Sequence, residues 1–167
     1  EGIPSLTNWL KKVLINEFSL ETSLINDDID LVKKTLVLFS DKKKCDLIFT
    51  TGGTGPSPRD ITPEATMSIS DKVMPGFGEQ MRQISLNFVP TAILSRQTAV
   101  IRGKTLIVNL PGQPKSIEQT LEGLKNENNT TIVPGIFSAI PYCLDLIGAP
   151  FIETNESIVK SFRPKKK

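Results

Sequence analysis

A glycine-rich turn between an apolar run and a helix start constrains the fold of this chain more than any other feature. The turn spans residues 50–60, follows Asp46-Leu47-Ile48-Phe49, and precedes a helix that we expect Thr62 to cap, with Pro63 at its first position. The backbone N–H groups of such a turn form a concave nest that attracts phosphate or another anion. The turn therefore predicts a strand–turn–helix unit with an anion site.

Helix-like and strand-like segments alternate along the rest of the chain. Apolar spacing, N-cap residues and prolines predict helices beginning near residue 3, after 26–28 and at 62–63, and helices over 75–88, 115–125 and 135–147, the last bent at Pro141. The predicted strands are 18–25, 46–49, 99–101 and 105–110, and the last two are joined by a tight hairpin at 102–104. This order favours an α/β layered domain around a mostly parallel sheet, in which ligands bind beyond the carboxyl ends of the strands.

Three polar turns are expected at that edge of the sheet. They are residues 26–28, the glycine loop 52–60 and the turn 111–114. Each also has a purely structural explanation. Asp27 or Asp28 caps the helix that follows, Asp60 hydrogen-bonds its own loop, and the proline-rich turn simply precedes a helix.

The bulk composition narrows the classes of protein. A length of 167 residues with 38% hydrophobic residues fits one soluble globular domain, and neither a signal peptide nor a membrane-length apolar stretch is visible. A net charge of +2 argues against nucleic acid as the main partner, and the basic tail 163–167 is expected to be a solvated terminus, with an RNA or lipid contact as the alternative. Cys45 and Cys143 are expected to be buried reduced thiols of a cytoplasmic protein.

The chain contains no histidine, which excludes the Ser-His-Asp triad, the Cys-His dyad and the common catalytic zinc sites. The glycine loop also differs from the two best-known phosphate loops. It has no following Lys-Ser/Thr as in the Walker A loop, and it does not match the dinucleotide pattern G-x-G-x-x-G.

Taken together, four ordered motifs resemble the molybdopterin adenylyltransferase family. They are Thr51-Gly52-Gly53-Thr54-Gly55 with Pro58-Arg59-Asp60 and Thr62-Pro63-Glu64-Ala65-Thr66, then Pro75-Gly76-Phe77-Gly78-Glu79-Gln80-Met81-Arg82, Leu94-Ser95-Arg96, and Asn109-Leu110-Pro111-Gly112-Gln113-Pro114-Lys115. The resemblance runs from Gly2 to about Pro164 and implies a three-layer α/β/α fold like that of molybdopterin-binding domains. It also implies transfer of AMP from Mg-ATP to the terminal phosphate of molybdopterin, and a homotrimer.

The resemblance also assigns residues. Asp27, Asp60 and Ser95 correspond to catalytic positions, and the two aspartates are expected to hold Mg²⁺. The phosphate and nucleotide contacts fall on Gly52, Gly53, Thr54, Gly55, Arg59, Pro111, Gly112, Gln113 and Pro114. The missing histidine agrees with this chemistry, because a phosphate monoester with a second pKa near ~6 is already a nucleophile at neutral pH.

Members of the family usually begin with a further apolar strand, so we expect the working protein to be longer than these residues. Two other functions remain open. One is a non-enzymatic molybdopterin-binding or scaffold module, and the other is a molybdenum-insertase-like role. Contacts that hand molybdopterin to other proteins of cofactor synthesis are a further expectation.

Overall fold

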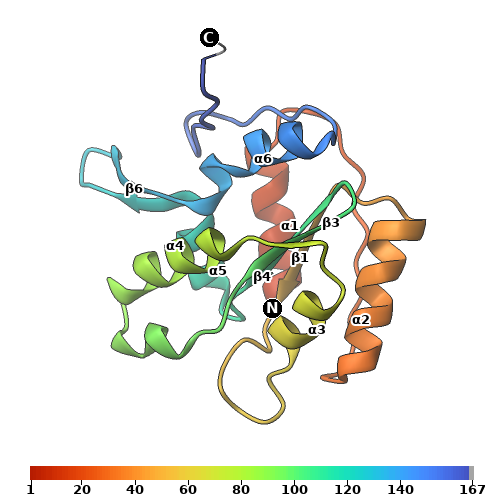
Figure 1. Cartoon of the computed structure of the whole chain (residues 1–167). Coiled ribbons are helices and arrows are strands. Elements are labelled where there is room, and N and C mark those ends of the chain that lie inside the picture. Colours follow the sequence, from red (N-terminus) through yellow and green to blue (C-terminus); the bar gives the residue numbers. More distant parts are fainter. Residues whose placement is uncertain (166–167) are drawn as a thin grey trace.

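In the computed structural model, which describes residues 1–165, helices cover both faces of a four-stranded sheet (Figure 1). The strands are β1 (Leu47–Thr51), β2 (Lys72–Val73), β3 (Ala99–Arg102) and β4 (Thr105–Leu110). Their order across the sheet is β1-β4-β3-β2. Only β1 and β4 run parallel, while β3 is antiparallel to both of its neighbours. The sheet is therefore mixed, and the expected parallel arrangement holds for the β1–β4 pair alone.

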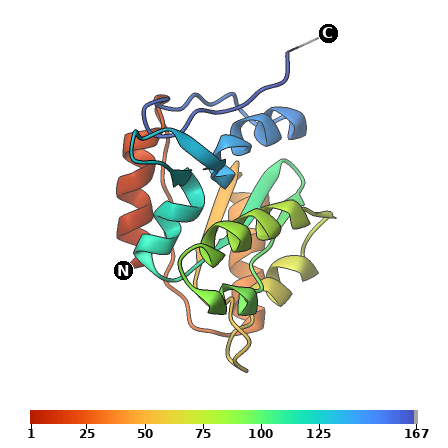
Figure 2. The ribbon, with the colours of Figure 1, turned by 90° about the vertical axis from the view of Figure 1, so that its left-hand side faces the viewer.

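The helices form two layers, one on each side of the sheet (Figure 2). One layer contains α1 (Gly2–Val13), α4 (Pro75–Leu86), α5 (Pro114–Glu122) and α6 (Ile140–Ile147). The other contains α2 (Ile29–Val37) and α3 (Thr62–Ser68). The three-layer α/β/α arrangement is thereby confirmed.

The alternation of side chains along β4 separates the two apolar cores. Leu106, Val108 and Leu110 join the core formed by α1, α4, α5 and α6, whereas Ile107 joins the core under α2 and α3. All six residues of β4 are buried. Such continuous burial is expected of a central strand whose two faces are both covered by helices.

Two hairpins complete the domain. The predicted turn between β3 and β4 is confirmed, and Gly103 adopts φ +55° there. A second hairpin, formed by β5 (Gly123–Lys125) and β6 (Thr131–Pro134), was not predicted as strands. The polar segment 126–130 is the turn that connects them, with the Asn126 side chain accepting the N–H groups of Asn128 and Thr130.

The predicted strand 18–25 is wrong, because this segment forms no ladder with any strand of the described residues. Phe18, Leu20 and Leu24 alternate as a strand would, yet all three are exposed, and Leu24 keeps 93% of its surface accessible. An extended segment becomes a strand only when a neighbour satisfies its backbone and covers one face. The alternation alone therefore over-predicted the strand.

Several helix boundaries also differ from the prediction, and α4 ends at Leu86 instead of residue 88. The helix α3 begins at Thr62 with Ile61 as its N-cap, so Thr62 is inside the helix rather than its cap. The helix α5 ends at Glu122, because Gly123 adopts φ +89° and leads into β5. The last helix is divided into a 3₁₀ turn, η3 (Ile136–Ser138), and α6, and Pro141 lies in the first turn of α6 instead of bending a longer helix.

Two short helical turns follow other elements. The π-turn η1 (Leu38–Lys42) continues α2, and the 3₁₀ turn η2 (Pro90–Leu94) leads from α4 toward β3. In η1, the side chain of Asp41 accepts hydrogen bonds from Arg102 Nε at 3.0 Å and Nη2 at 2.7 Å. This guanidinium lowers the pKa of the Asp41 carboxyl to about 2. The pair ties the end of α2 to the β3–β4 hairpin.

The thiol and tail predictions are confirmed in part. Both cysteines are free, but only Cys143 is buried, and burial raises the pKa of the Cys143 thiol. Arg163 does not belong to a solvated tail, because its guanidinium pairs with Asp145 and stacks 4.1 Å above the centre of the Phe151 ring. Lys166 and Lys167 lie outside the described residues.

Within residues 1–165 no helix has the length and apolar character needed to cross a bilayer.

Candidate functional site: the glycine loop and its neighbours

The glycine loop, residues 52–60, leaves the carboxyl end of β1 and enters α3, as the sequence predicts (Figure 1). Gly52 and Gly53 adopt φ +89° and +66°, a region that side chains with a Cβ atom disfavour. The N–H of Gly52 donates to the carbonyl of Leu110 at 3.4 Å, at the end of the neighbouring strand. The two strand ends are therefore joined where the loop begins.

Gly53 is packed tightly against the start of α3. The carbonyl of Gly53 accepts the Thr62 N–H at 3.1 Å, and a Cβ atom at position 53 would collide with the Thr62 hydroxyl. Glycine is required here both by the backbone angle and by the close approach. This contact places the end of the loop beside its beginning, next to the carboxyl end of β1.

Arg96 holds the other side of the loop. Its Nε donates to the Gly55 carbonyl at 2.8 Å, its Nη2 donates to the Asp60 carbonyl at 2.7 Å, and its Nη1 pairs with Glu64 of α3. The Arg96 main-chain N–H also donates to the carbonyl of Thr54 at 2.8 Å. One residue thereby binds three carbonyls of the loop.

The backbone donors of the loop are left free. Within residues 1–165, the N–H groups of Gly53, Thr54 and Gly55 donate to no protein acceptor, although Thr54 is a buried residue. Buried N–H groups are almost always paired in native proteins, so the free donor of Thr54 points to a ligand or to water, beside the half-buried donors of Gly53 and Gly55. Such a row of free donors is what an anion nest, the role predicted for this loop, would require.

Helix N-termini add positive potential beside the nest. Gly2, at the start of α1, packs on Thr51, since a Cβ atom there would lie 2.7 Å from the Thr51 hydroxyl. The helix α5 begins at Pro114, the last residue of the turn 111–114, and packs against α1. The amino ends of both helices carry partial positive charge, which favours an anion at this edge of the sheet.

The turn 111–114 lies against the glycine loop, as predicted. A Cβ atom on Gly112 would be 3.5 Å from the Cα of Gly52, so the two backbones are in contact at this point. Gln113 is the N-cap of α5, and its side chain makes no capping hydrogen bond. Gln113 is exposed, which leaves its amide accessible beside the loop.

Asp60 both supports the loop and offers a free oxygen. Its Oδ2 accepts the Ser57 N–H at 3.0 Å and lies against Gly55, which confirms the structural role considered for it. Its Oδ1 accepts no hydrogen bond within residues 1–165. Arg59 is exposed and makes no ion pair with the described residues, so its charge is available at the rim.

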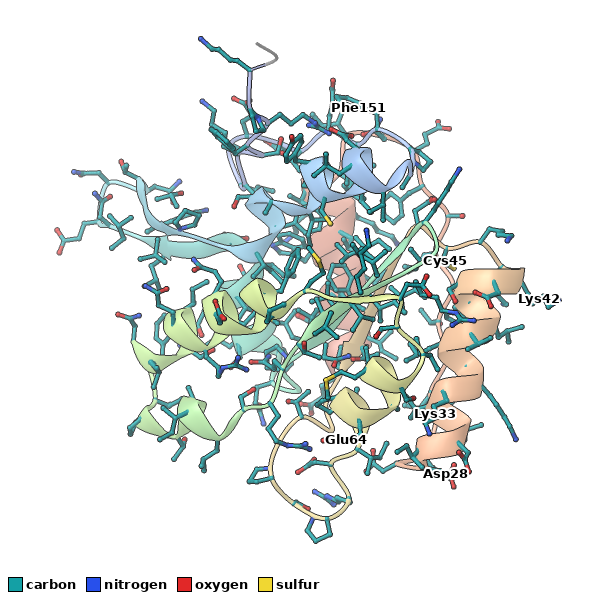
Figure 3. All side chains as sticks on the ribbon, viewed as in Figure 1. Asp28, Lys33, Lys42, Cys45, Glu64 and Phe151 are labelled. Carbon is teal, nitrogen blue, oxygen red and sulfur yellow. The ribbon has the colours of Figure 1, made fainter. Side chains whose placement is uncertain are left out.

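The structure separates the roles of the two neighbouring aspartates before α2. Asp28 is the N-cap, because its Oδ1 accepts the Leu31 N–H at 2.8 Å. Asp27 is exposed and has no capping role. Figure 3 places Asp28 and Glu64 at the same end of the domain, where the amino ends of the packed helices α2 and α3 lie. Within residues 1–165, no hydrogen bond or ion pair joins Asp27 to the glycine loop.

Ser95 lies next to the loop because Arg96, its neighbour, is bonded to Thr54. The carbonyl of Ser95 accepts Arg82 Nη1 at 3.2 Å, and the same nitrogen donates to the Gln97 carbonyl at 2.9 Å. The Ser95 hydroxyl accepts only a long hydrogen bond, 3.5 Å from the Gln97 N–H. The hydroxyl is therefore held only weakly by the protein, and Ser95 is only partly buried.

Sequence reasoning missed three polar residues of this site. Arg96 and Glu64 lie within the recognised motifs but received no role, and neither did Asn109 at the end of β4. Asn109 Nδ2 donates to the hydroxyls of Thr50 and Thr66, both at 2.9 Å, and so links β1 to α3 beneath the loop. A polar residue inside the otherwise apolar run 106–110 was the available signal.

The comparisons with known proteins agree with one another. A family model described as a probable molybdopterin binding domain matches residues 5–129. The molybdopterin adenylyltransferase of Haemophilus influenzae is 56% identical over 165 residues, which cover 99% of this chain and 84% of that protein. The enzyme of the same name from Escherichia coli is 55% identical over 99% of this chain and 85% of its own length.

A solved structure gives the same result for the fold. The molybdopterin biosynthesis enzyme MoaB of Thermus thermophilus superimposes with a TM-score of 0.73 at 37% identity, covering 90% of this chain and 86% of that one. Sequence and structure thus lead to one family, and its model and its relatives cover most of the described chain. The chain belongs to the molybdopterin adenylyltransferase family, within the molybdopterin-binding domain fold.

Proposed function

We propose that this protein is a molybdopterin adenylyltransferase, which transfers AMP from ATP to the terminal phosphate of molybdopterin in molybdenum cofactor biosynthesis. The observation that supports it best is the row of unpaired N–H groups at Gly53, Thr54 and Gly55, beside Ser95 and the turn 111–114. Relatives that are 55–56% identical over nearly the whole chain carry this activity in their names.

The reaction suits a site without histidine. An oxygen of the molybdopterin phosphate attacks the α-phosphorus of ATP and forms a new P–O bond. The bond between the α-phosphorus and the bridging oxygen breaks, and pyrophosphate leaves with that oxygen and its electron pair. The nucleophile is already anionic near pH 7, so the protein contributes alignment and charge stabilisation and no general base is required.

The chain's own residues have distinct tasks in this scheme. Gly53, Thr54 and Gly55 donate N–H hydrogen bonds to phosphate oxygens, and the amino ends of α1 and α5 add positive potential. Arg59 supplies an exposed cation at the rim. Gly112 and Gln113 border the nucleotide, and the Ser95 hydroxyl contacts the pterin substrate.

Magnesium fits the donor set of this site. Among residues 1–165 no group of three or more acidic, cysteine or histidine side chains is placed to hold a metal. Mg²⁺ needs fewer, because one or two carboxylates and the substrate phosphates commonly hold it. Asp27 and the free oxygen of Asp60 would supply those carboxylates. Bound Mg²⁺ would neutralise charge on the phosphates of ATP.

An assay of product formation tests the proposal. With molybdopterin, Mg²⁺ and ATP labelled at the α-phosphate, we expect label in molybdopterin and one pyrophosphate released for each AMP transferred. Binding of molybdopterin with no transfer would instead indicate the non-enzymatic binding or scaffold module. A reaction that depends on molybdate and not on ATP would indicate the insertase-like role.

We also propose a homotrimer in the cytoplasm that passes its product to other proteins of cofactor synthesis. The helix α6 buries Ile140, Cys143 and Leu144 in the core, which leaves Leu146 as its exposed large apolar residue. A better candidate follows α4, where exposed apolar residues cluster along the chain: Leu86, Phe88, Val89, Ile93 and Leu94. Light scattering of wild type and Ile93→Asp tests the contact, and a trimer unaffected by the substitution would contradict it.

A further inference from the structure

We propose that Arg96 is a positioning residue that fixes the glycine loop in its phosphate-binding shape without itself binding phosphate. This inference rests on the proposed function of the same site. Its support is that each of the three side-chain nitrogens of Arg96 donates a hydrogen bond, two of them to loop carbonyls and one to Glu64.

Peptide geometry links two of the held carbonyls, those of Gly53 and Thr54, to the free N–H groups of the residues that follow them. In a planar trans peptide, the C=O of one residue and the N–H of the next point in opposite directions. The Thr54 carbonyl is bound by the Arg96 N–H, so the Gly55 N–H points away from Arg96. In the same way, the Gly53 carbonyl bound by Thr62 orients the Thr54 N–H.

The guanidinium closes the far part of the loop. Gly55 and Asp60 stand at the two ends of the segment 55–60, and Nε and Nη2 of Arg96 bind one carbonyl of each. The planar fork of an arginine holds such acceptors in a fixed geometry, which the single ammonium of a lysine cannot reproduce. Arg96 therefore sets the separation between Gly55 and the Asp60 backbone.

Glu64 controls the charge of this arrangement. Its Oε1 pairs with Arg96 Nη1, and its Oε2 is buried without a partner among residues 1–165. The pair neutralises Arg96 and leaves it with little attraction for a phosphate. Phosphate recognition is then assigned to the backbone donors, while Arg59 remains the available arginine at the rim.

The test measures anion binding at the loop itself. Backbone ¹⁵N spectra of the protein titrated with inorganic pyrophosphate report the amides of Gly53 and Gly55. In Arg96→Lys we expect an affinity lower by about tenfold, the equivalent of one lost charge-assisted hydrogen bond. We also expect a thermal midpoint close to that of wild type. Arg102→Lys is the matched control, because Arg102 likewise binds one carboxylate and one carbonyl, those of Asp41 and Ile69, away from the loop.

Each outcome has a distinct meaning. If pyrophosphate leaves the Gly53 and Gly55 amides of the wild type unmoved, the phosphate site of the proposed function is wrong, and the role of Arg96 is overturned with it. If the wild type responds and Arg96→Lys binds equally tightly, only the positioning role is overturned. An equal loss in Arg102→Lys would show a general effect of arginine removal and would also overturn it.

A second variant covers the case in which Arg96→Lys fails to fold. Glu64→Gln keeps the carbonyl contacts of Arg96 and removes the charge that holds its third nitrogen. We expect faster hydrogen exchange at Gly53 and Gly55 and a smaller, measurable loss of pyrophosphate affinity. Unchanged exchange and affinity in Glu64→Gln would overturn the positioning role.

Discussion

The hydroxyl of Thr62 occupies the space that a Cβ atom on Gly53 would need, and the Thr62 N–H donates to the Gly53 carbonyl at 3.1 Å. The first turn of α3 and the glycine loop are thus in direct contact. Any side chain at position 53 must displace the helix start.

Gly53→Ala is therefore expected to be more damaging than Gly52→Ala. Both positions have positive φ, which costs a residue with a Cβ atom about 1–2 kcal/mol. A Cβ atom at position 52 meets nothing within 4 Å, whereas one at position 53 meets Thr62. Urea unfolding should show the larger loss of stability for Gly53→Ala. Equal losses would mean that the contact with Thr62 relaxes freely.

Asp27→Asn should lower turnover and leave the fold intact. Asp27 is exposed and caps no helix, so its charge is free to act on the proposed Mg²⁺ and its substitution removes no structural hydrogen bond. We expect a fall in turnover on the order of 10²-fold, the scale at which a group that stabilises developing charge contributes. Steady-state assays over a Mg²⁺ series measure it.

Asp28→Asn is the control for this prediction. Asparagine caps helices as well as aspartate does, so α2 should keep its stability, and turnover should remain at the wild-type level. Equal activity of Asp27→Asn and wild type would remove Asp27 from the metal site.

Asp60→Asn separates the two tasks of Asp60. The amide oxygen of asparagine can still accept the Ser57 N–H, so the loop should keep its shape, while the negative charge is lost. Titration calorimetry should show weaker binding of Mg-ATP, and the difference should disappear when ATP is added without Mg²⁺. Wild-type affinity and turnover together would exclude a metal role for Asp60.

The ion pair of Asp41 with Arg102 predicts a pH dependence of stability. The pKa of Asp41 is lowered from 3.8 to about 2 in the folded protein. A lowered pKa means that the folded state prefers the ionised carboxylate. The contribution of the pair to stability is therefore complete above about pH 4 and is lost as the pH falls toward 2.

Comparison of wild type with Asp41→Asn isolates this effect. The difference in free energy of unfolding between the two should be constant near neutral pH and should shrink between pH 4 and 2. Glu127→Gln is the control, because Glu127 lies in the exposed turn between β5 and β6, away from Arg102. Its difference from wild type should not contain the change that is due to the ion pair with Arg102. A difference that persists unchanged at pH 2 would contradict the assignment.

Local signals explain which parts of the fold were predictable. The glycine loop, the helix starts at prolines and caps, and the β3–β4 hairpin all depend on residues that are close in sequence. Residues 18–25 carry the alternation of a strand but meet no neighbouring strand in the described chain. Whether a segment pairs depends on distant residues, which its own pattern does not contain.

The same distinction applies to the site. The sequence located the loop and its acidic rim, but it left open whether Asp27 or Asp28 caps α2, and only the position of the Leu31 N–H decides that. Arg96 was overlooked because its acceptors in Glu64, Asp60 and Gly55 lie 32, 36 and 41 positions away. Contacts over such separations follow from the assembled layers of the domain.

The parallel pairing of β1 with β4 has a consequence for variation in this site. Thr51 and Leu110, the last residues of the two strands, are register partners, so the glycine loop and the turn 111–114 begin at the same level. Their separation equals the spacing of neighbouring strands, about 4.8 Å, and is independent of the sequence of either turn. Insertions or substitutions in one turn can therefore reshape the surface that a substrate meets while the starting points of both turns stay fixed.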